Sequence, residues 1–145
     1  MLLGYAEPER FFSWEMLDKV SGKGEGLWTL PIQFLLWLHK RGYEILPIEI
    51  FDYDRFAQEG REYLVGRYGK EVADAQVMHS DLLAEQTHAA TFSRRISCKQ
   101  RVPMLGDLRS LLDQGYLHMV NVNANALNDR PGYAGHVVLL IGYED

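Results

Sequence analysis

Cysteine is nearly absent from this sequence, because Cys98 is the single one among 145 residues. One cysteine cannot form a disulfide within its own chain, which fits the reducing cytosol, where thiols stay free. There is also no excess of positive charge, since 20 Asp and Glu outnumber 15 Lys and Arg, and the net charge is −5 at pH 7. Nucleic-acid binding needs a basic face that compensates phosphate charge. We therefore expect a cytoplasmic protein that does not bind nucleic acid.

Long hydrophobic runs are missing too. The longest, residues 34–38 and 137–141, fall far short of the roughly 18 apolar residues of a membrane-spanning helix. Residues 1–6 carry no basic side chain, so they do not form a secretory signal peptide, and they indicate the last turn of a helix. The sequence has no glycine-rich phosphate-binding loop followed by a Lys and a Ser or Thr at the start of a helix. Nucleotide hydrolysis is therefore unsupported. We expect no membrane partner and no cofactor.

What the sequence does contain is enough apolar material for a folded core. Hydrophobic residues make up 47% of the chain and aromatic residues 12%. This composition excludes intrinsic disorder. The length fits one domain of roughly 100–150 residues. We therefore predict a single domain over residues 1–145.

The first two thirds of the chain have helical periodicity and helix-capping residues. Ser13 is a typical N-cap and Gly22 a typical stop, and Asp52 and Gly69 mark another helix in the same way. Thr29 is expected to cap the helix between them, and Ser80 to separate two later ones. The predicted helices span residues 13–20, 29–41, 52–68, 70–79 and 81–92.

Strands are expected mainly in the last third. Their predicted ranges are residues 43–50, 96–101, 117–123 and 136–143, with one helix over residues 107–114. The last strand is apolar on both faces, which is typical of a central position in a sheet. Helices come first and antiparallel strands last, an order that predicts the α+β class.

The last strand begins with a titratable residue. His136 follows Gly135 and precedes five aliphatic residues and Gly142-Tyr143. Histidine at the mouth of a strand is suited to general-base chemistry near neutral pH. A capped core histidine is the alternative interpretation.

The segment 135–143, preceded by a helix and a short strand, resembles the bacteriocin-processing (double-glycine) peptidases, bacterial members of the papain-like cysteine peptidase superfamily. Residues 24–29 and 41–45 are similar to that family as well. The resemblance implies a papain-like fold, hydrolysis of peptide bonds and His136 as the catalytic base. It also implies a nucleophilic cysteine on a helix before residue 1 and an Asp on a strand after residue 145. We therefore expect a domain that is incomplete at both ends and inactive as written.

Asn123 is the candidate that would orient His136. If residues 117–123 and 136–143 pair as a hairpin, Asn123 can lie opposite His136 on the same face. The alternative is an Asn that caps its own turn.

Three further groups of residues have competing interpretations. Cys98 is either a nucleophile or, as a residue in the middle of a strand, a small buried hydrophobe. Asp81, Glu85 and His88 share one face of a helix and form either a metal site or a solvated surface, and we expect no metal. An aromatic set either lines a ligand groove or packs in the core. The members of this set are Phe11, Phe12, Trp14, Trp28, Trp37 and Tyr43.

Three functions follow from these patterns. The first is a papain-like cysteine peptidase with His136 as its base, which we expect to act only if the natural chain extends beyond residues 1–145 at both ends. The second is a non-catalytic module of the same fold that binds a peptide or a protein. The third is a partial domain that another chain completes, which includes self-association through the apolar last strand.

Overall fold

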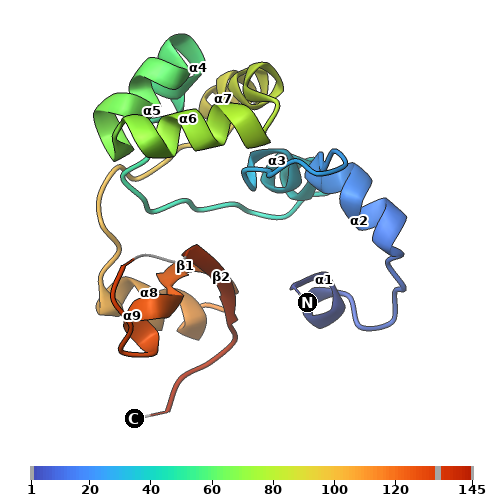
Figure 1. The fold of residues 1–145 in the computed structure, drawn as a ribbon. Coiled ribbons are helices and arrows are strands. Elements are labelled where there is room, and N and C mark those ends of the chain that lie inside the picture. Colours follow the sequence, from blue (N-terminus) through green and yellow to red (C-terminus); the bar gives the residue numbers. More distant parts are fainter. Residues whose placement is uncertain (1, 133–134, 145) are drawn as a thin grey trace. The chain divides into compact units, whose positions relative to one another are not determined.

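The computed structural model describes residues 2–132 and 135–144. These residues contain nine helices and one two-stranded antiparallel sheet (Figure 1), so the α+β class is confirmed. The chain divides into two compact units. We name Phe12–Val102 the helical unit, and Met1–Phe11 together with Pro103–Asp145 the hairpin unit. The single domain expected from the sequence stays a prediction, because two compact units can belong to one domain.

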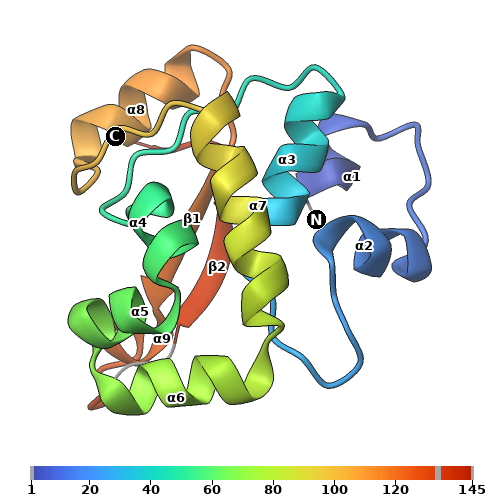
Figure 2. The ribbon, with the colours of Figure 1, turned by 90° about the horizontal axis from the view of Figure 1, so that it is seen from above.

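The helical unit is built from six helices. They are α2 (Trp14–Ser21), α3 (Ile32–Lys40), α4 (Tyr53–Glu59), α5 (Arg61–Tyr68), α6 (Lys70–His79) and α7 (Leu82–Arg95). Helix α7 packs against both α3 and α4 (Figure 2), and α5 packs against α6.

Local capping chemistry sets several of the helix ends. The Ser13 hydroxyl accepts a hydrogen bond from the Met16 backbone N–H at 3.2 Å, and Gly22 ends α2 in a left-handed conformation. The Asp52 carboxylate caps α4 by accepting from the Arg55 N–H. These three predicted caps are confirmed. Thr29 is not a cap, because α3 begins after Pro31. Ser80 separates α6 from α7 as expected, as the C-cap of α6, while Asp81 caps α7.

The predicted continuous helix over residues 52–68 is wrong, because Gly60 divides it into α4 and α5. Gly60 has φ 53° and ψ −116°, values that interrupt helical hydrogen bonding. The Gln86 side chain on α7 lies where a Cβ on Gly60 would be, at 2.8 Å, and donates a hydrogen bond to the Ala57 carbonyl. A glycine is therefore required at the point where α7 passes this break.

The helical unit contains one continuous apolar core. Phe56, Phe92 and Ile32 are its largest fully buried side chains. Tyr53 packs against Phe92 with ring centroids 4.4 Å apart, and Phe51 meets Tyr63 edge to face. Burial of each large apolar side chain contributes roughly 1.5–3 kcal/mol, so this cluster dominates the stability of the unit.

The predicted strands over residues 43–50 and 96–101 do not form. The two segments meet only at a single parallel bridge between Ile48 and Lys99. The Lys99 N–H donates to the Pro47 carbonyl, and the Glu49 N–H donates to the Lys99 carbonyl. Proline has no N–H to continue the ladder, which limits the pairing to this bridge.

The hairpin unit contains the two strands. Its elements are α1 (Leu2–Ala6), α8 (Leu105–Asp113), β1 (His118–Asn123), α9 (Ala124–Leu127) and β2 (Gly135–Leu140). The predicted hairpin is confirmed, since β1 and β2 pair antiparallel. The predicted central position of β2 is wrong for the described residues, in which β1 is its one strand partner. Within those residues, Leu3 is the one buried side chain of this unit.

Helix length also bears on membrane association. In the described part of the chain, no helix is long and apolar enough to cross a lipid bilayer.

Candidate functional site

His136 lies near the start of β2 and is exposed to solvent. Its partner across the hairpin is Val122, whereas Asn123 pairs with Gly135. Side chains alternate between the faces of a strand, so Asn123 and His136 lie on opposite faces of the sheet. The predicted register, with Asn123 opposite His136 on one face, is wrong by one residue.

The side chain of Asn123 serves the turn that follows β1. Its Oδ1 accepts a hydrogen bond from the Asn125 backbone N–H at 3.1 Å and so caps α9. Its Nδ2 donates to the Gly132 carbonyl at 3.1 Å. The capping interpretation therefore describes Asn123, whose side chain serves this turn and not His136.

The face of the hairpin that carries His136 is otherwise mainly aliphatic. Val122, Val120, Val138 and Leu140 share it, and all four are half-buried. Among the described residues, none hydrogen-bonds to the His136 ring. A catalytic base needs a nucleophile within hydrogen-bond reach, and this face of the described hairpin supplies none.

A second histidine on this face, His118, was not anticipated from the sequence. Its Nε2 lies 3.0 Å from the Leu108 carbonyl oxygen of α8. A carbonyl can only accept, so this ring nitrogen carries the proton and donates it. The alternation of His118 with Val120 and Val122 along β1 was the available sequence signal. The bond links β1 to α8.

The segment after β2 is also fixed to α8. The Tyr143 hydroxyl donates to Asp113 Oδ1 at 2.9 Å, and the Arg109 guanidinium lies 5.2 Å from the centre of the Tyr143 ring. The hydrogen bond to the carboxylate raises the pKa of Tyr143. In the described part of the hairpin unit, polar contacts therefore join α8 to β1 and to the segment after β2, beside a half-buried aliphatic face of the hairpin.

The only thiol of the chain lies in the helical unit. Cys98 is half-buried, and its Sγ is 3.9 Å from the Glu49 carbonyl oxygen. Burial raises the pKa of Cys98, and the carboxylates of Glu49 and Asp52 raise it further. A nucleophilic cysteine needs the opposite, a pKa lowered by positive charge or a helix N-terminus. The structure therefore favours the small-hydrophobe interpretation of Cys98.

Glu49 and Tyr53 form a polar pair next to this thiol. The Tyr53 hydroxyl donates to Glu49 Oε1 at 2.7 Å. Burial raises the pKa of Glu49, and burial together with the neighbouring carboxylate raises the pKa of Tyr53. Both shifts disfavour charge, so the environment of Cys98 does not stabilise an ion pair with a thiolate.

The predicted helix face of Asp81, Glu85 and His88 does not form a metal site. Asp81 caps α7 by accepting from the Ala84 N–H, and Glu85 is 6% exposed and accepts from the Leu30 N–H at 2.9 Å. No three potential metal-binding side chains come together within the described ranges. The alternative of a solvated face is also wrong for Glu85. Its second oxygen, Oε2, is buried and has no hydrogen-bond partner among the described groups.

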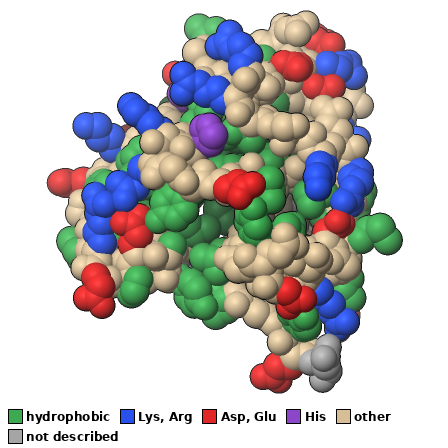
Figure 3. Space-filling model, turned by 180° about the vertical axis from the view of Figure 1, so that it is seen from behind, with side chains coloured by type: hydrophobic (Ala, Val, Ile, Leu, Met, Phe, Trp, Pro, Cys, Tyr) green, Lys and Arg blue, Asp and Glu red, His purple; other side chains and the backbone are tan. Residues whose placement is uncertain are grey.

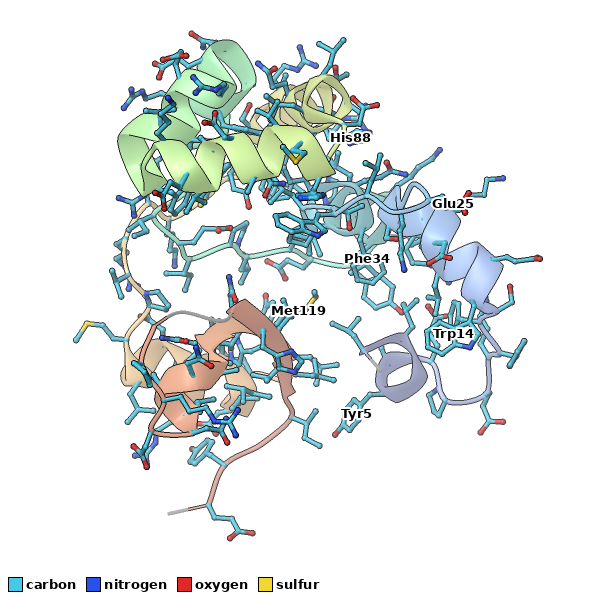
Figure 4. All side chains as sticks on the ribbon, viewed as in Figure 1. Tyr5, Trp14, Glu25, Phe34, His88 and Met119 are labelled. Atoms are coloured by element: carbon cyan, nitrogen blue, oxygen red, sulfur yellow. The ribbon has the colours of Figure 1, made fainter. Side chains whose placement is uncertain are left out.

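The aromatic set neither forms the core nor lines one groove. Phe11 and Trp14 are 89% and 82% exposed, and Trp14 is visible at the start of α2 in Figure 4. Trp28 stacks on His79 with ring centroids 4.6 Å apart. Trp37 is half-buried on α3.

Comparison with protein-family models, with curated proteins and with solved structures finds no match for this chain. The proposed function therefore rests on the chemistry of the sites described above.

Proposed function

We propose that this chain is a non-catalytic module that binds an extended polypeptide segment along the free edge of β2. The observation that carries the proposal is the isolation of β2, an aliphatic strand with β1 as its one strand partner among the described residues. An unpaired strand edge presents a row of backbone donors and acceptors that an incoming chain can complete.

Side-chain exposure on this hairpin supports the same proposal. Val137 is 52% exposed, Met119 is 37% exposed, and Met119 is labelled on β1 in Figure 4. Two-stranded hairpins are marginally stable in water, and a third strand adds both hydrogen bonds and apolar contact. The gain in stability on pairing would supply part of the binding free energy.

The absence of catalysis rests on Cys98. Its raised pKa and the neighbouring carboxylates disfavour the thiolate that a cysteine peptidase needs. The order α8, β1, β2 and the Gly135-His136 pair support descent from papain-like peptidases of the bacteriocin-processing type. The single free thiol supports a reducing cytosol as its compartment.

Val137→Lys tests the strand edge, because a lysine on an edge strand opposes further pairing. Extended peptides selected on the wild-type protein by display should lose binding to Val137→Lys. They should retain binding to Met104→Lys, a control that changes a 69% exposed apolar residue outside the strands of the same unit. If a second copy of the chain is the partner, light scattering should show the molar mass rising with protein concentration. Peptides that bind both variants equally would place recognition elsewhere.

A separate assay tests the absence of catalysis. Peptide amides should show no turnover that disappears on alkylation or in Cys98→Ser. Turnover sensitive to both changes would contradict a non-catalytic module.

A further inference from the structure

An open groove runs between three helices of the helical unit. Its volume is about 360 Å³, within the roughly 300–1,000 Å³ of small-molecule sites. It belongs to the helical unit, so it is a different surface from the β2 edge. The lining residues are Lys19 and Val20 of α2, Gln33, Leu36, Trp37 and Lys40 of α3, and Thr91 and Arg95 of α7.

Three cations converge on this groove, one from each helix. Lys19, Lys40 and Arg95 line it, and no lining residue is acidic. None of the three forms an ion pair with a carboxylate of the described chain, whereas Arg55 pairs with Glu59 and Arg61 with Asp74. Each lies in the last turn of its helix, where a cation offsets the helix dipole. The dipole accounts for a cation on each helix but not for three cations around one groove without an anion.

Three of the remaining lining residues, Val20, Leu36 and Trp37, give the groove an apolar part, and Gln33 and Thr91 are polar. Val20 is buried, and Leu36 and Trp37 are half-buried. The Trp37 ring stacks with Phe34, at 6.0 Å between ring centroids, and the Arg41 guanidinium lies 4.8 Å from the ring centre. Phe34 is labelled on α3 in Figure 4. A fixed indole is a suitable contact for a flat or aliphatic ligand.

The positions of α2 and α3 around the groove are fixed by a specific contact. Gln33 Nε2 donates to the Lys19 carbonyl at 3.0 Å. The Gln33 side chain also occupies the space that a Cβ on Gly22 would need. The groove walls are therefore joined by a hydrogen bond and do not depend on exposed side chains alone.

We infer that this groove binds a small amphipathic anion, an apolar body that carries a carboxylate or a phosphate. The body contacts Leu36 and Trp37, and the anionic head lies among Lys19, Lys40 and Arg95. Lys and Arg are the side chains that recognise both head groups. Figure 3 shows one face of the molecule, on which hydrophobic, basic and acidic side chains are mixed.

The test uses 2-naphthoate and 2-naphthyl phosphate as anionic probes and 2-naphthylmethanol as their neutral counterpart. Isothermal titration calorimetry gives the affinities, and the indole N–H signal of Trp37 in an NMR spectrum reports the location. At least one anion should shift this signal and bind about tenfold more tightly than the alcohol, with weaker binding at high salt. The tighter anion identifies the head group.

Charge removal supplies the matched variants. Lys19→Gln and Lys40→Gln should each lower the affinity for the anion about two- to fivefold, which is the effect of losing one exposed ion pair. The double variant should lower the affinity further. Lys23→Gln, an exposed lysine next to α2 that does not line the groove, should bind like wild type. Val137→Lys should also bind the anion with wild-type affinity, because Val137 belongs to the proposed strand edge and not to the groove.

Two results would overturn the inference. One is equal binding of the alcohol and both anions. The other is binding of the anions that leaves the Trp37 indole N–H signal unshifted, or that has the same affinity in Lys40→Gln as in Lys23→Gln. A thermal melt of each variant establishes that the helical unit is folded in the comparison.

Discussion

The helical unit and the hairpin unit differ in how they are held together. The helical unit has a continuous buried cluster around Phe56 and Phe92. In the described part of the hairpin unit, Leu3 alone is buried, and α8 is joined to its neighbours by hydrogen bonds from His118 and Tyr143. Apolar burial is the main source of folding free energy. The comparison indicates that the helical unit contributes most of the folding free energy, and it is the reason for our proposal that a partner stabilises the hairpin unit.

The largest expected effect is the loss of a core ring. Phe92→Ala should lower the free energy of unfolding of the helical unit by about 3–5 kcal/mol, because Phe92 is fully buried and packs on Tyr53. Leu83→Ala is the matched control on the same helix, since Leu83 is 75% exposed, and it should change stability by less than about 0.5 kcal/mol. Denaturant unfolding followed by circular dichroism measures both. Equal effects would contradict the assignment of the core.

A smaller effect concerns the buried carboxyl of Glu85. Burial raises the pKa of Glu85 above its ordinary value of 4.5, despite the hydrogen bond from Leu30. The folded state therefore holds this proton more tightly than the unfolded state does. The stabilisation is fully present below pH 4.5 and is lost as the pH rises through the raised folded-state pKa.

Glu85→Gln should reduce this pH dependence, because an amide keeps the acceptor for Leu30 and cannot ionise. Its free energy of unfolding should exceed that of wild type at pH 8 and approach it near pH 4. Glu59→Gln is the control, since Glu59 forms an exposed pair with Arg55. Parallel pH profiles of wild type and Glu85→Gln would show that the Glu85 carboxyl is not desolvated. Glu49, whose pKa burial also raises, should account for part of the remaining slope.

The smallest expected effect lies in the hairpin unit. Tyr143→Phe removes the hydrogen bond to Asp113 and keeps the ring under Arg109. Amide exchange in α8 and in residues 141–144 should become faster, while the unfolding transition of the helical unit stays unchanged. An equal shift of that transition would mean that the two units unfold together.

Local chemistry explains which parts of the fold could be predicted. Ser13, Gly22 and Asp52 mark helix ends through contacts with backbone atoms a few residues away, so their sequence signals are sufficient. At the break, Gly60 is in contact with Gln86, which is distant in sequence and bonds to the Ala57 carbonyl. Nothing local to residues 52–68 reveals that contact.

The candidate sites were harder to predict because they depend on long-range contacts. Glu85 accepts its hydrogen bond from the Leu30 N–H, 55 residues away in the sequence, a contact that has no local signal. The hairpin register pairs Val122 with His136, and the apolar pattern of β2 does not distinguish a register shift of one residue because residues on both of its faces are apolar. The cations of the groove come from three helices and form no motif in the sequence.

Amide hydrogen exchange at several protein concentrations tests the contrast between the two units most directly. At low concentration, amides of α7 should exchange through global unfolding, whereas those of β2 should exchange through much cheaper local opening. Protection in β2 should rise with protein concentration, or on addition of a peptide selected for binding, and should not rise in Val137→Lys. Protection in β2 equal to that in α7 at every concentration would contradict the proposal that β2 is an open edge completed by a partner.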